Sequence, residues 1–348
     1  MSQVPRRRVL TGMRTTGVLH LGHYDGALRK WLEYQENADS ENFFLLADYQ
    51  ALTTHSDHPE ILTTSVVDVA LDWLAVGLDP TRNDVHFVQQ SQIPERHELS
   101  MLLQMVAKWS DIKDIPTVRT ELKNLKTEET VGFFAYPCDQ AADVFMVQPV
   151  PSAKYDRVVV PVGDDQRSIL ERCNKIVNRF NTQYKVELFR PCIIVSGEKG
   201  TLKGIDGQEK MGKSLNNAIN LTDSPEVVHK KIHERMFTDP NHLRVSDAGT
   251  TAGNMVFEYL RKFDPDQATV EQLAIDYETP GVRLGDVQLK NRLVNVLNEM
   301  LAPIQERRSK FSRSDVRDIV MSGTSRAREL CVPVLDEVRR LMHVGFPA

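Results

Sequence analysis

The chain has 348 residues, of which 26% are charged and 41% are apolar, and its formal net charge is −5. This composition is typical of a globular protein large enough for two domains, and the negative net charge excludes binding to nucleic acid through bulk charge. No apolar run reaches the length of about 18 residues that a membrane-spanning helix needs, and the N-terminus lacks the apolar stretch of a signal peptide. The four cysteines include no Cys-x-x-Cys pair, which predicts free thiols in a cytoplasmic protein and neither a zinc nor an iron–sulfur site.

Apolar runs and helical patterns alternate along the first part of the chain. Strands are predicted at residues 8–12, 42–48, 84–90, 157–162 and 193–195. Helical periodicity separates them, most clearly at residues 59–78 and 165–180. Beyond residue 216 strand signals nearly vanish, and helices are predicted at residues 224–236, 254–263, 268–277, 285–311 and 313–343.

This order of elements predicts an α/β fold with two domains. Strands that alternate with helices form a doubly wound parallel sheet, so residues 1–216 are expected to make a Rossmann-like catalytic domain. Residues at about 55–135 read as a helical insertion in that domain. Residues 217–348 are expected to form an all-helical domain, whose last helix packs back on the catalytic domain.

Two short segments carry the chemistry. Thr16 to His23 places two histidines and two glycines where the first strand gives way to a helix, and Glu209 to Ser214 places two lysines beside a glycine. Amides and imidazoles at the start of a helix suit phosphates, and mobile lysines suit a departing pyrophosphate. Together the two segments predict a site that cleaves ATP between its α and β phosphates.

The lysine segment has a rival interpretation. Residues 207–214 also satisfy Gly-x-x-x-x-Gly-Lys-Ser, the P-loop pattern of NTPases. A P-loop follows directly on an apolar strand and opens a sheet domain. Residues 197–208 are polar, and helical patterns follow residue 216. The sequence therefore disfavours a P-loop NTPase.

The two segments, His20-Leu21-Gly22-His23 and Lys210-Met211-Gly212-Lys213-Ser214, resemble the signatures of class I aminoacyl-tRNA synthetases. Further segments narrow the resemblance to the tryptophanyl-tRNA synthetase family. Those segments are residues 47–53 (similar to the family's second-strand segment), 136–143 (Tyr-Pro-Cys-Asp-Gln-Ala-Ala-Asp), 160–166 (Val-Pro-Val-Gly-Asp-Asp-Gln), 285–286 and 301–308. The resemblance covers about residues 8–310. Cys138-Asp139 and Gly212 depart from the family's usual residues.

The resemblance implies that the protein is a ligase. ATP and L-tryptophan would give tryptophanyl-adenylate, and the tryptophanyl group would then pass to tRNA(Trp). Mg²⁺ would accompany ATP without a carboxylate cage of its own. The resemblance also implies a cytoplasmic homodimer, with no role for a membrane or DNA, and places the insertion at the interface. The insertion carries more apolar side chains than a small helical insert is expected to bury alone. They are Leu99, Leu102, Leu103 and Met105, near Trp109.

The resemblance also assigns roles to residues. His20 and His23 would hold the phosphates, and Lys210 and Lys213 would close over the pyrophosphate. ATP binding would use Arg14, Thr15, Thr16, Gly22, His23, Gly163, Asp164, Asp165, Leu202, Lys210, Met211, Gly212, Lys213 and Ser214. Tryptophan binding would use Asp143, Tyr136, Gln140, Gln166, Gly12 and Gln50. Asp165 is expected to hold the nucleoside, to cap the next helix, or both.

Asp143 is the expected specificity residue. It lies on an apolar helix, where an unpaired carboxylate is costly, and an indole N–H is a donor that it can accept. Such a site rejects an analogue that lacks the donor by roughly 10⁴-fold or more. Gln140 fits a tyrosyl enzyme as well, whereas Ala141-Ala142 and residues 163–166 favour tryptophan. A paralogue that does not charge tRNA is the other alternative, and the intact histidine and lysine pairs speak against it.

Basic residues cluster toward the C-terminus. They are Arg307, Arg308, Lys310, Arg313, Arg317, Arg326, Arg328, Arg339 and Arg340. A solvated helix face and a surface that binds RNA both fit this pattern, and the resemblance implies that the helical domain at residues 217–348 binds the tRNA anticodon.

Overall fold

The structure is a computed structural model that describes residues 7–37, 39–82, 84–124, 130–149, 157–196, 202–208, 211–212 and 215–345. The chain forms two compact units. The sheet unit comprises Met1–Gly17, Arg29–Lys199 and Phe311–Ala348, and the helical unit comprises Val18–Leu28 and Gly200–Lys310. The chain passes from one unit to the other after Gly17, Leu28, Lys199 and Lys310, whereas the sequence predicted one domain boundary after residue 216.

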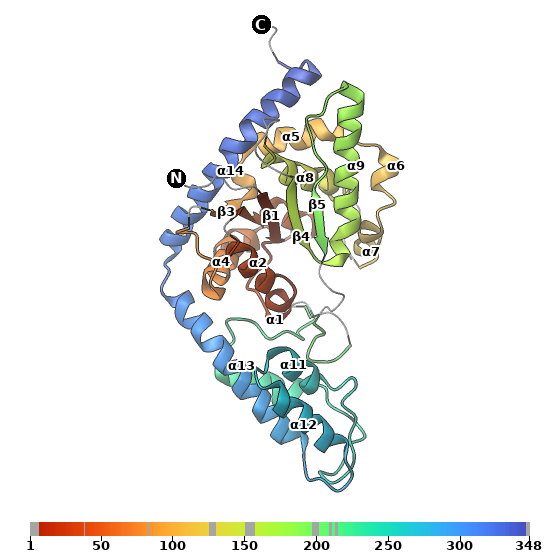
Figure 1. The fold of residues 1–348 in the computed structure, drawn as a ribbon, viewed down its shortest axis with the longest axis vertical. Coiled ribbons are helices and arrows are strands. Elements are labelled where there is room, and N and C mark those ends of the chain that lie inside the picture. The colour runs from red at the N-terminus through yellow and green to blue at the C-terminus, as the bar shows by residue number, and fades with distance from the viewer. Residues whose placement is uncertain are drawn as a thin grey trace. The chain divides into compact units, whose positions relative to one another are not determined.

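The sheet unit is built on five parallel strands in the order β3-β2-β1-β4-β5 (Figure 1). The strands are β1 (Arg7–Arg14), β2 (Ser40–Ala47), β3 (Val85–Gln89), β4 (Val158–Val162) and β5 (Ile193–Ser196). The order reverses between β1 and β4, which makes their carboxyl ends the switch point where such sheets bind ligands. The predicted doubly wound α/β fold is confirmed, and each predicted strand is present.

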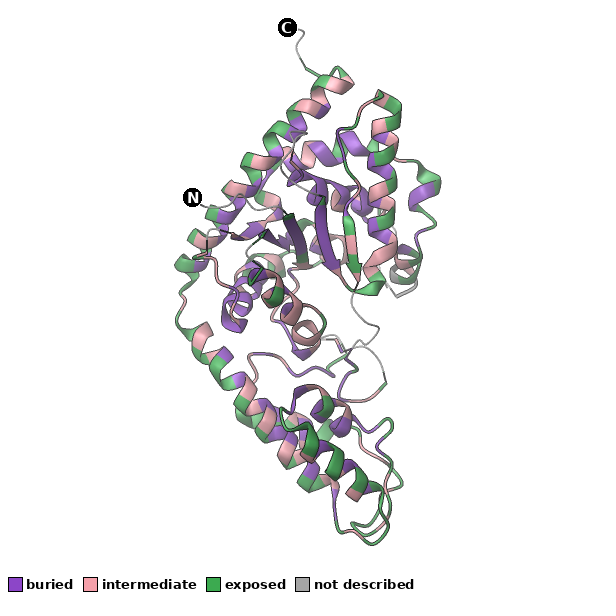
Figure 2. Cartoon of the chain, viewed as in Figure 1, coloured by how far each residue is buried: buried purple, intermediate pink, exposed green. Residues whose placement is uncertain are grey.

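Helices cover this sheet. They are α2 (Arg29–Gln35), α3 (Asp48–His55), α4 (Glu60–Val76), α5 (Pro94–Gln104), α6 (Trp109–Ile112), α7 (Pro116–Asn124), α8 (Val131–Met146), α9 (Arg167–Tyr184) and α14 (Arg313–Met342). Figure 2 shows the result: β2, the middle of β1 and most of β3 and β4 are buried, β5 at the edge is exposed or half-buried, and the outward faces of α9 and α14 are exposed. Of residues 47–53, which resembled a strand segment, only Ala47 lies in a strand, and α3 begins at Asp48.

The last helix, α14, closes the β3 edge of the sheet (Figure 1). A side chain at Gly323 would place its Cβ 2.3 Å from the carbonyl oxygen of Phe87, so only glycine allows this close approach. The next residue, Thr324, accepts a hydrogen bond at Oγ1 from the Gln89 N–H at 2.9 Å. α14 therefore supplies a partner that an edge strand otherwise lacks.

The expectation that the α5 leucines are left over for a partner subunit is wrong. Leu99, Leu102 and Leu103 are 0%, 4% and 0% exposed, within the core of the sheet unit. The exposed apolar side chains nearby are Met105 and Trp109, at 65% and 58%. The leucines lie on the inner face of α5, because the helix packs on α8 and α14.

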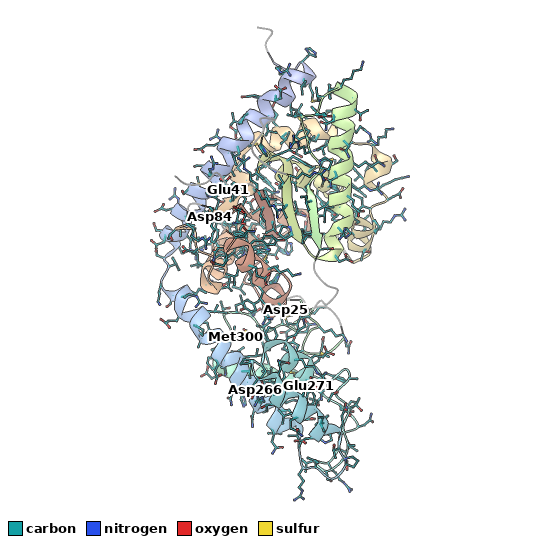
Figure 3. The ribbon with its side chains drawn as sticks, in the orientation of Figure 1. Asp25, Glu41, Asp84, Asp266, Glu271 and Met300 are labelled. Carbon is teal, nitrogen blue, oxygen red and sulfur yellow. The ribbon has the colours of Figure 1, made fainter. Side chains whose placement is uncertain are left out.

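A buried ion cluster ties α14 to the amino ends of the strands. Glu41 at the start of β2 (Figure 3) accepts hydrogen bonds from Arg8 Nε at 3.1 Å and Arg326 Nε at 2.8 Å, and His86 Nε2 lies 3.4 Å away. Burial alone would raise the pKa of Glu41, but His86, Arg326 and Arg8 together lower it to about 2. Because the folded pKa lies below the ordinary value of 4.5, this carboxylate stabilises the fold above pH 4.5, and that stabilisation is lost as the pH falls toward 2.

We expect Glu41→Gln to destabilise the sheet unit by about 3–5 kcal/mol, because it leaves the buried Arg8 guanidinium without its carboxylate. Urea unfolding followed by tryptophan fluorescence measures this, since all three tryptophans (Trp31, Trp73 and Trp109) lie in the sheet unit. The control is Glu36→Gln, whose carboxylate is 71% exposed in its pair with Arg82 and is expected to cost less than about 1 kcal/mol. Equal losses would contradict the special role of the buried cluster.

The helical unit contains no strand among its described residues. Its elements are α1 (Leu21–His23), a π-helical turn (Tyr24–Leu28), α10 (Pro225–Arg235), α11 (Met255–Phe263), α12 (Gln267–Glu278) and α13 (Asp286–Ser309). Asp25 in the π-helical turn (Figure 3) accepts a hydrogen bond from Lys262 Nζ of α11 at 2.7 Å, which joins the N-terminal segment to the later helices. In the described part of the chain, no helix has the length and apolar character to cross a membrane.

Candidate active site

Polar residues follow the two strands at the switch point of the sheet. β1 ends at Arg14 and is followed by Thr15 and Thr16, and β4 is followed by Gly163 to Gln166. Since β1 and β4 are parallel neighbours, their carboxyl ends lie at one edge. The sheet unit thus brings these predicted ligand residues to the place where α/β proteins bind substrates.

Two of the predicted residues have buried polar atoms that no described residue satisfies. Thr15 Oγ1 and Gln140 Oε1 are both buried without a hydrogen-bond partner among the described residues. Such atoms are rare, because each one loses its hydrogen bonds to water without compensation. A bound substrate is one way to satisfy them. Arg14 also lies near α8, with its guanidinium carbon 6.0 Å from the centre of the Tyr136 ring.

The predicted tryptophan residues of α8 share one face of that helix. Tyr136, Gln140 and Asp143 are spaced by four and three residues, which places them on the same side. Tyr136 is 1% exposed and Asp143 is 3% exposed. The helix therefore aligns an aromatic ring, an amide and a carboxylate along one face.

Asp143 has two protein partners that the sequence did not reveal. Arg96 Nε donates to Oδ1 at 2.6 Å, and Gln90 Nε2 lies 3.1 Å from Oδ1 and 2.8 Å from Oδ2. Asp143 therefore keeps two protein donors in addition to the indole N–H that it is predicted to accept. A signal was present: on a helix that begins at Pro94, Arg96 falls on the same face as Leu99 and Leu103, and a charge on an apolar face needs a partner.

Burial raises the pKa of Asp143, and the neighbouring Arg96 guanidinium opposes this rise. The carboxylate and guanidinium are both nearly inaccessible to water, so each depends on the other for its charge.

Gln90 connects the carboxylate to α3. Its Oε1 accepts a hydrogen bond from the Gln50 backbone N–H at 3.1 Å, while its Nε2 faces Asp143. The main chain of Gln50 is thus linked to the Asp143 carboxylate through Gln90. Gly12 on β1 lies beside Leu45 of β2, and a Cβ at Gly12 would be 2.5 Å from the Leu45 carbonyl oxygen. Packing between the two strands accounts for this glycine.

The turn after β4 is exposed and held by its own residues. Asp164, Asp165 and Gln166 form one 3₁₀ turn, in which Gln166 Nε2 donates to Asp165 Oδ2 at 3.0 Å. The Asp165 carbonyl oxygen accepts a hydrogen bond from Thr117 of α7 at 2.6 Å. The expectation that Asp165 caps the next helix is wrong, because α9 begins at Arg167 with Gln166 at the capping position. Among the described residues, the side-chain amide of Gln166 donates to the neighbouring Asp165 carboxylate and makes no hydrogen bond to α8.

In the helical unit, backbone hydrogen bonds orient both histidines of the first signature. Gly22 N–H donates to His20 Nδ1 at 3.1 Å, and His20 N–H donates to His23 Nδ1 at 3.2 Å. The ring centres are 3.8 Å apart. An Nδ1 atom that accepts a hydrogen bond carries no proton, so each neutral ring has its proton on Nε2. The local fold therefore fixes both imidazoles as Nε2 donors.

The described part of the lysine segment contacts this histidine turn. Gly22 N–H also lies 3.4 Å from Met211 Sδ, and Met211 is 4% exposed. Met211 N–H donates to the Leu202 carbonyl oxygen at 3.2 Å, and Gly212 N–H donates to Asn217 Oδ1 at 2.9 Å. The structure thus brings Gly22, Leu202, Met211 and Gly212 together. Lys210, Lys213 and Ser214 lie outside the described residues.

The P-loop alternative does not fit this region. Residues 202–208 contain turns without a strand, and residues 215–224 contain turns without a helix. A P-loop joins a strand to a helix, so residues 207–214 are not one. Within the described ranges, no group of three or more His, Cys, Asp and Glu side chains is placed to hold a metal ion.

Part of the basic cluster is used within the sheet unit. Arg326, Arg328 and Arg339 donate to Glu41, Glu95 and Glu98. Arg340 pairs with Glu337 on α14 itself. These four arginines bind carboxylates of their own chain, which favours a structural role for them.

Known proteins resemble this chain in sequence and in fold. The family model described as "tRNA synthetases class I (W and Y)" matches residues 3–302. The chain is 40% identical to "Tryptophan--tRNA ligase" of Clostridium longisporum, over 97% of each chain, and 41% identical to that of Streptococcus mutans, over 97% and 98%. Its fold matches tryptophanyl-tRNA synthetase of Campylobacter jejuni complexed with ADP and tryptophan, with a TM-score of 0.82 and 26% identity over 97% and 99% of the two chains.

Proposed function

Because this chain belongs to the class I tRNA synthetases for tryptophan and tyrosine, we propose roles for its residues in the activation of tryptophan and the charging of tRNA. The reaction is that of a tryptophan–tRNA ligase. The amino acid's carboxylate attacks the α-phosphate of ATP, pyrophosphate leaves, and the aminoacyl group passes to the tRNA. Because no side chain becomes covalently attached, catalysis rests on positioning and on stabilising charge.

Tryptophan recognition is proposed for the sheet unit. The observation that supports it best is the buried carboxylate of Asp143, which is surrounded by donors and shares a helix face with Tyr136 and Gln140. Asp143 would accept the indole N–H, and the unsatisfied Gln140 Oε1 would accept a second substrate donor. The turn at residues 163–166 would contact the nucleotide and the amino acid's ammonium group, through Asp165 and Gln166 respectively. Thr15 Oγ1 would also bind the nucleotide.

Phosphate binding is proposed for the helical unit. His20 and His23 each present an Nε2–H donor, because their Nδ1 atoms accept backbone N–H groups. Donors fixed in advance stabilise the charge that grows on the α-phosphate without reorganising. Lys210 and Lys213 would neutralise the departing pyrophosphate. Mg²⁺ would enter as the cation of the ATP substrate, bound mainly through the phosphate oxygens.

The tyrosyl and non-charging alternatives are not favoured. The curated relatives that match almost the whole chain are tryptophan–tRNA ligases.

Arg313 and Arg317 on α14 are the exposed basic residues that we propose for tRNA contact, since the later arginines are paired with carboxylates. We place the reaction in the cytoplasm, because the four cysteines are buried free thiols.

One experiment tests the proposed function. ATP–pyrophosphate exchange is measured with each proteinogenic amino acid in turn. We expect exchange with tryptophan alone, followed by charging of tRNA(Trp). Exchange that depends on tyrosine would contradict the specificity, and the absence of exchange with any amino acid would contradict the catalytic assignment.

We also propose a homodimer that uses α5, α6 and the start of α8. Met101, Met105, Trp109 and Val131 expose 49%, 65%, 58% and 86% of their surface there. The Trp109 ring packs edge-on against Phe134 at 5.0 Å, which shows that α6 and α8 present neighbouring surfaces. Four exposed apolar side chains on neighbouring surfaces favour a contact with the same face of a second copy of the chain.

Light scattering at micromolar concentration is expected to give about twice the chain mass of 39.6 kDa. Met105→Glu should shift the protein toward a monomer, because it places a charge in the apolar contact. The control is Ile275→Glu on α12, where the side chain is also exposed (58%). A monomeric wild-type protein that still charges tRNA would contradict the interface.

A further inference from the structure

The carboxylate of Asp143 belongs to a larger buried cluster that the sequence did not predict. At its centre is the guanidinium of Arg96, which is 1% exposed. Arg96 Nε donates to Asp143 Oδ1 at 2.6 Å, Nη2 donates to the Asp139 carbonyl oxygen at 2.9 Å, and Nη1 lies 3.2 Å from Asp139 Oδ1. Three acceptor atoms on one turn of α8 are therefore held by a single side chain of α5.

The outer part of the cluster fixes the guanidinium from the other side. Arg96 Nη1 is 3.0 Å from His97 Nδ1, and Ser100 donates to Asp139 Oδ1 at 2.6 Å. A guanidinium can only donate, so His97 Nδ1 must accept and the ring is neutral. Burial and the charge of Arg96 both lower the pKa of His97, in agreement with that state. Each of the three guanidinium nitrogens of Arg96 thus has at least one acceptor.

The two carboxylate oxygens of Asp143 accept different numbers of hydrogen bonds. Oδ1 accepts from both Arg96 and Gln90, whereas Oδ2 accepts from Gln90 alone among the described residues. A carboxylate oxygen has two lone pairs, so Oδ1 is filled and Oδ2 keeps one acceptor position. Gln90 cannot turn its amide round, because its Oε1 accepts the Gln50 N–H.

We propose that Arg96 is a positioning residue for substrate selection: its guanidinium holds Asp143 by Oδ1 and leaves Oδ2 as the acceptor for the indole N–H. This rests on the proposed role of Asp143 and adds a second residue to it. The Arg96 charge also favours the ionised carboxylate, which can only accept, over the protonated form, which can donate to a wrong ligand. Arg96 itself does not contact the substrate.

The test compares two amino acids that differ only in this donor. They are tryptophan and 3-benzothienylalanine, in which a ring sulfur replaces the indole N–H. Pyrophosphate exchange gives kcat/KM for each with the full chain. In Arg96→Gln we expect the preference for tryptophan to fall at least about tenfold, through a higher KM for tryptophan with kcat and the KM for ATP little changed, because the lost interaction is one of ground-state binding.

Two further variants separate positioning from general damage. Arg96→Lys keeps the charge without the planar fork, so its preference should lie between those of wild type and Arg96→Gln. Asp139→Asn removes the second negative charge beside the same guanidinium, retains an acceptor oxygen for Ser100 and leaves the contacts of Asp143 in place; its preference should stay within about threefold of wild type. Circular dichroism melting checks that each variant is folded, and Arg96→Lys decides the matter if Arg96→Gln does not fold.

The outcomes that overturn the proposal differ from those that overturn the proposed function. If Arg96→Gln, or Arg96→Lys in its place, lowers kcat/KM for both amino acids by the same factor, Arg96 is only structural. If the wild-type enzyme shows no preference for tryptophan over benzothienylalanine, the role of Asp143 fails first. If the wild-type enzyme shows no exchange with tryptophan, the proposed function fails.

Discussion

Asp143→Asn is expected to lower kcat/KM for tryptophan by a factor on the order of 10³, with far smaller changes for phenylalanine. The reason is that neither described hydrogen-bond partner of the carboxylate can become an acceptor: Arg96 can only donate, and Gln90 is fixed by its contact with Gln50. The asparagine oxygen would turn to Arg96, where the short contact is charge-assisted. The asparagine NH₂ group would then face the Gln90 N–H and the indole N–H. Donors would face donors in a buried place, and none of them would have an acceptor.

Pyrophosphate exchange with tryptophan, tyrosine and phenylalanine measures this loss of selection. The control is Asp111→Asn, which removes a carboxylate that pairs with Lys175 and Arg179 at α9 and is not part of the α8 face. Thermal unfolding of both variants separates loss of selection from loss of structure. If Asp143→Asn leaves the ratio of tryptophan to phenylalanine unchanged, Asp143 serves the fold and the indole binds elsewhere.

The arrangement of strands and helices could be predicted from the sequence because it depends on local patterns. Continuous apolar runs marked each buried strand, and the loss of such runs after residue 216 marked the helical part. Where the prediction was wrong, long-range packing decided. The α5 leucines look like surplus apolar surface in the sequence, but α8 and α14, which come later in the chain, cover them.

The chemistry of the pocket was less predictable for the same physical reason. Asp143 could be found from its motif, but its partners Gln90 and Arg96 lie 53 and 47 residues away along the chain. Neither has a local signature as strong as a glycine turn, and only the position of Arg96 on an apolar helix face hinted at burial. The histidine pair was predictable because its capping contacts are local. The sequence could not, however, reveal which ring nitrogen is protonated, since this depends on the backbone geometry.

His20→Asn is expected to reduce kcat for adenylate formation by about 10²–10³-fold, the usual effect of removing one fixed donor from a site of developing negative charge. The substitution is chosen because it separates two functions of His20. As the capping residue of α1, His20 accepts the Gly22 N–H at 3.1 Å. Asparagine is a good capping residue and can accept the same N–H, but its short side chain lacks a donor at the position of Nε2.

His20→Ala removes both functions and serves as the matched comparison. Its kcat should fall as far as that of His20→Asn, while only the alanine variant should lose about 1 kcal/mol of stability, because the cap is gone. The KM for tryptophan should stay constant in both, since the proposed indole contact belongs to Asp143. Single-turnover formation of the adenylate and thermal unfolding supply the two measurements. An asparagine variant with wild-type kcat would show that His20 only caps the helix, and the phosphate contact would then have to come from His23 and the lysines.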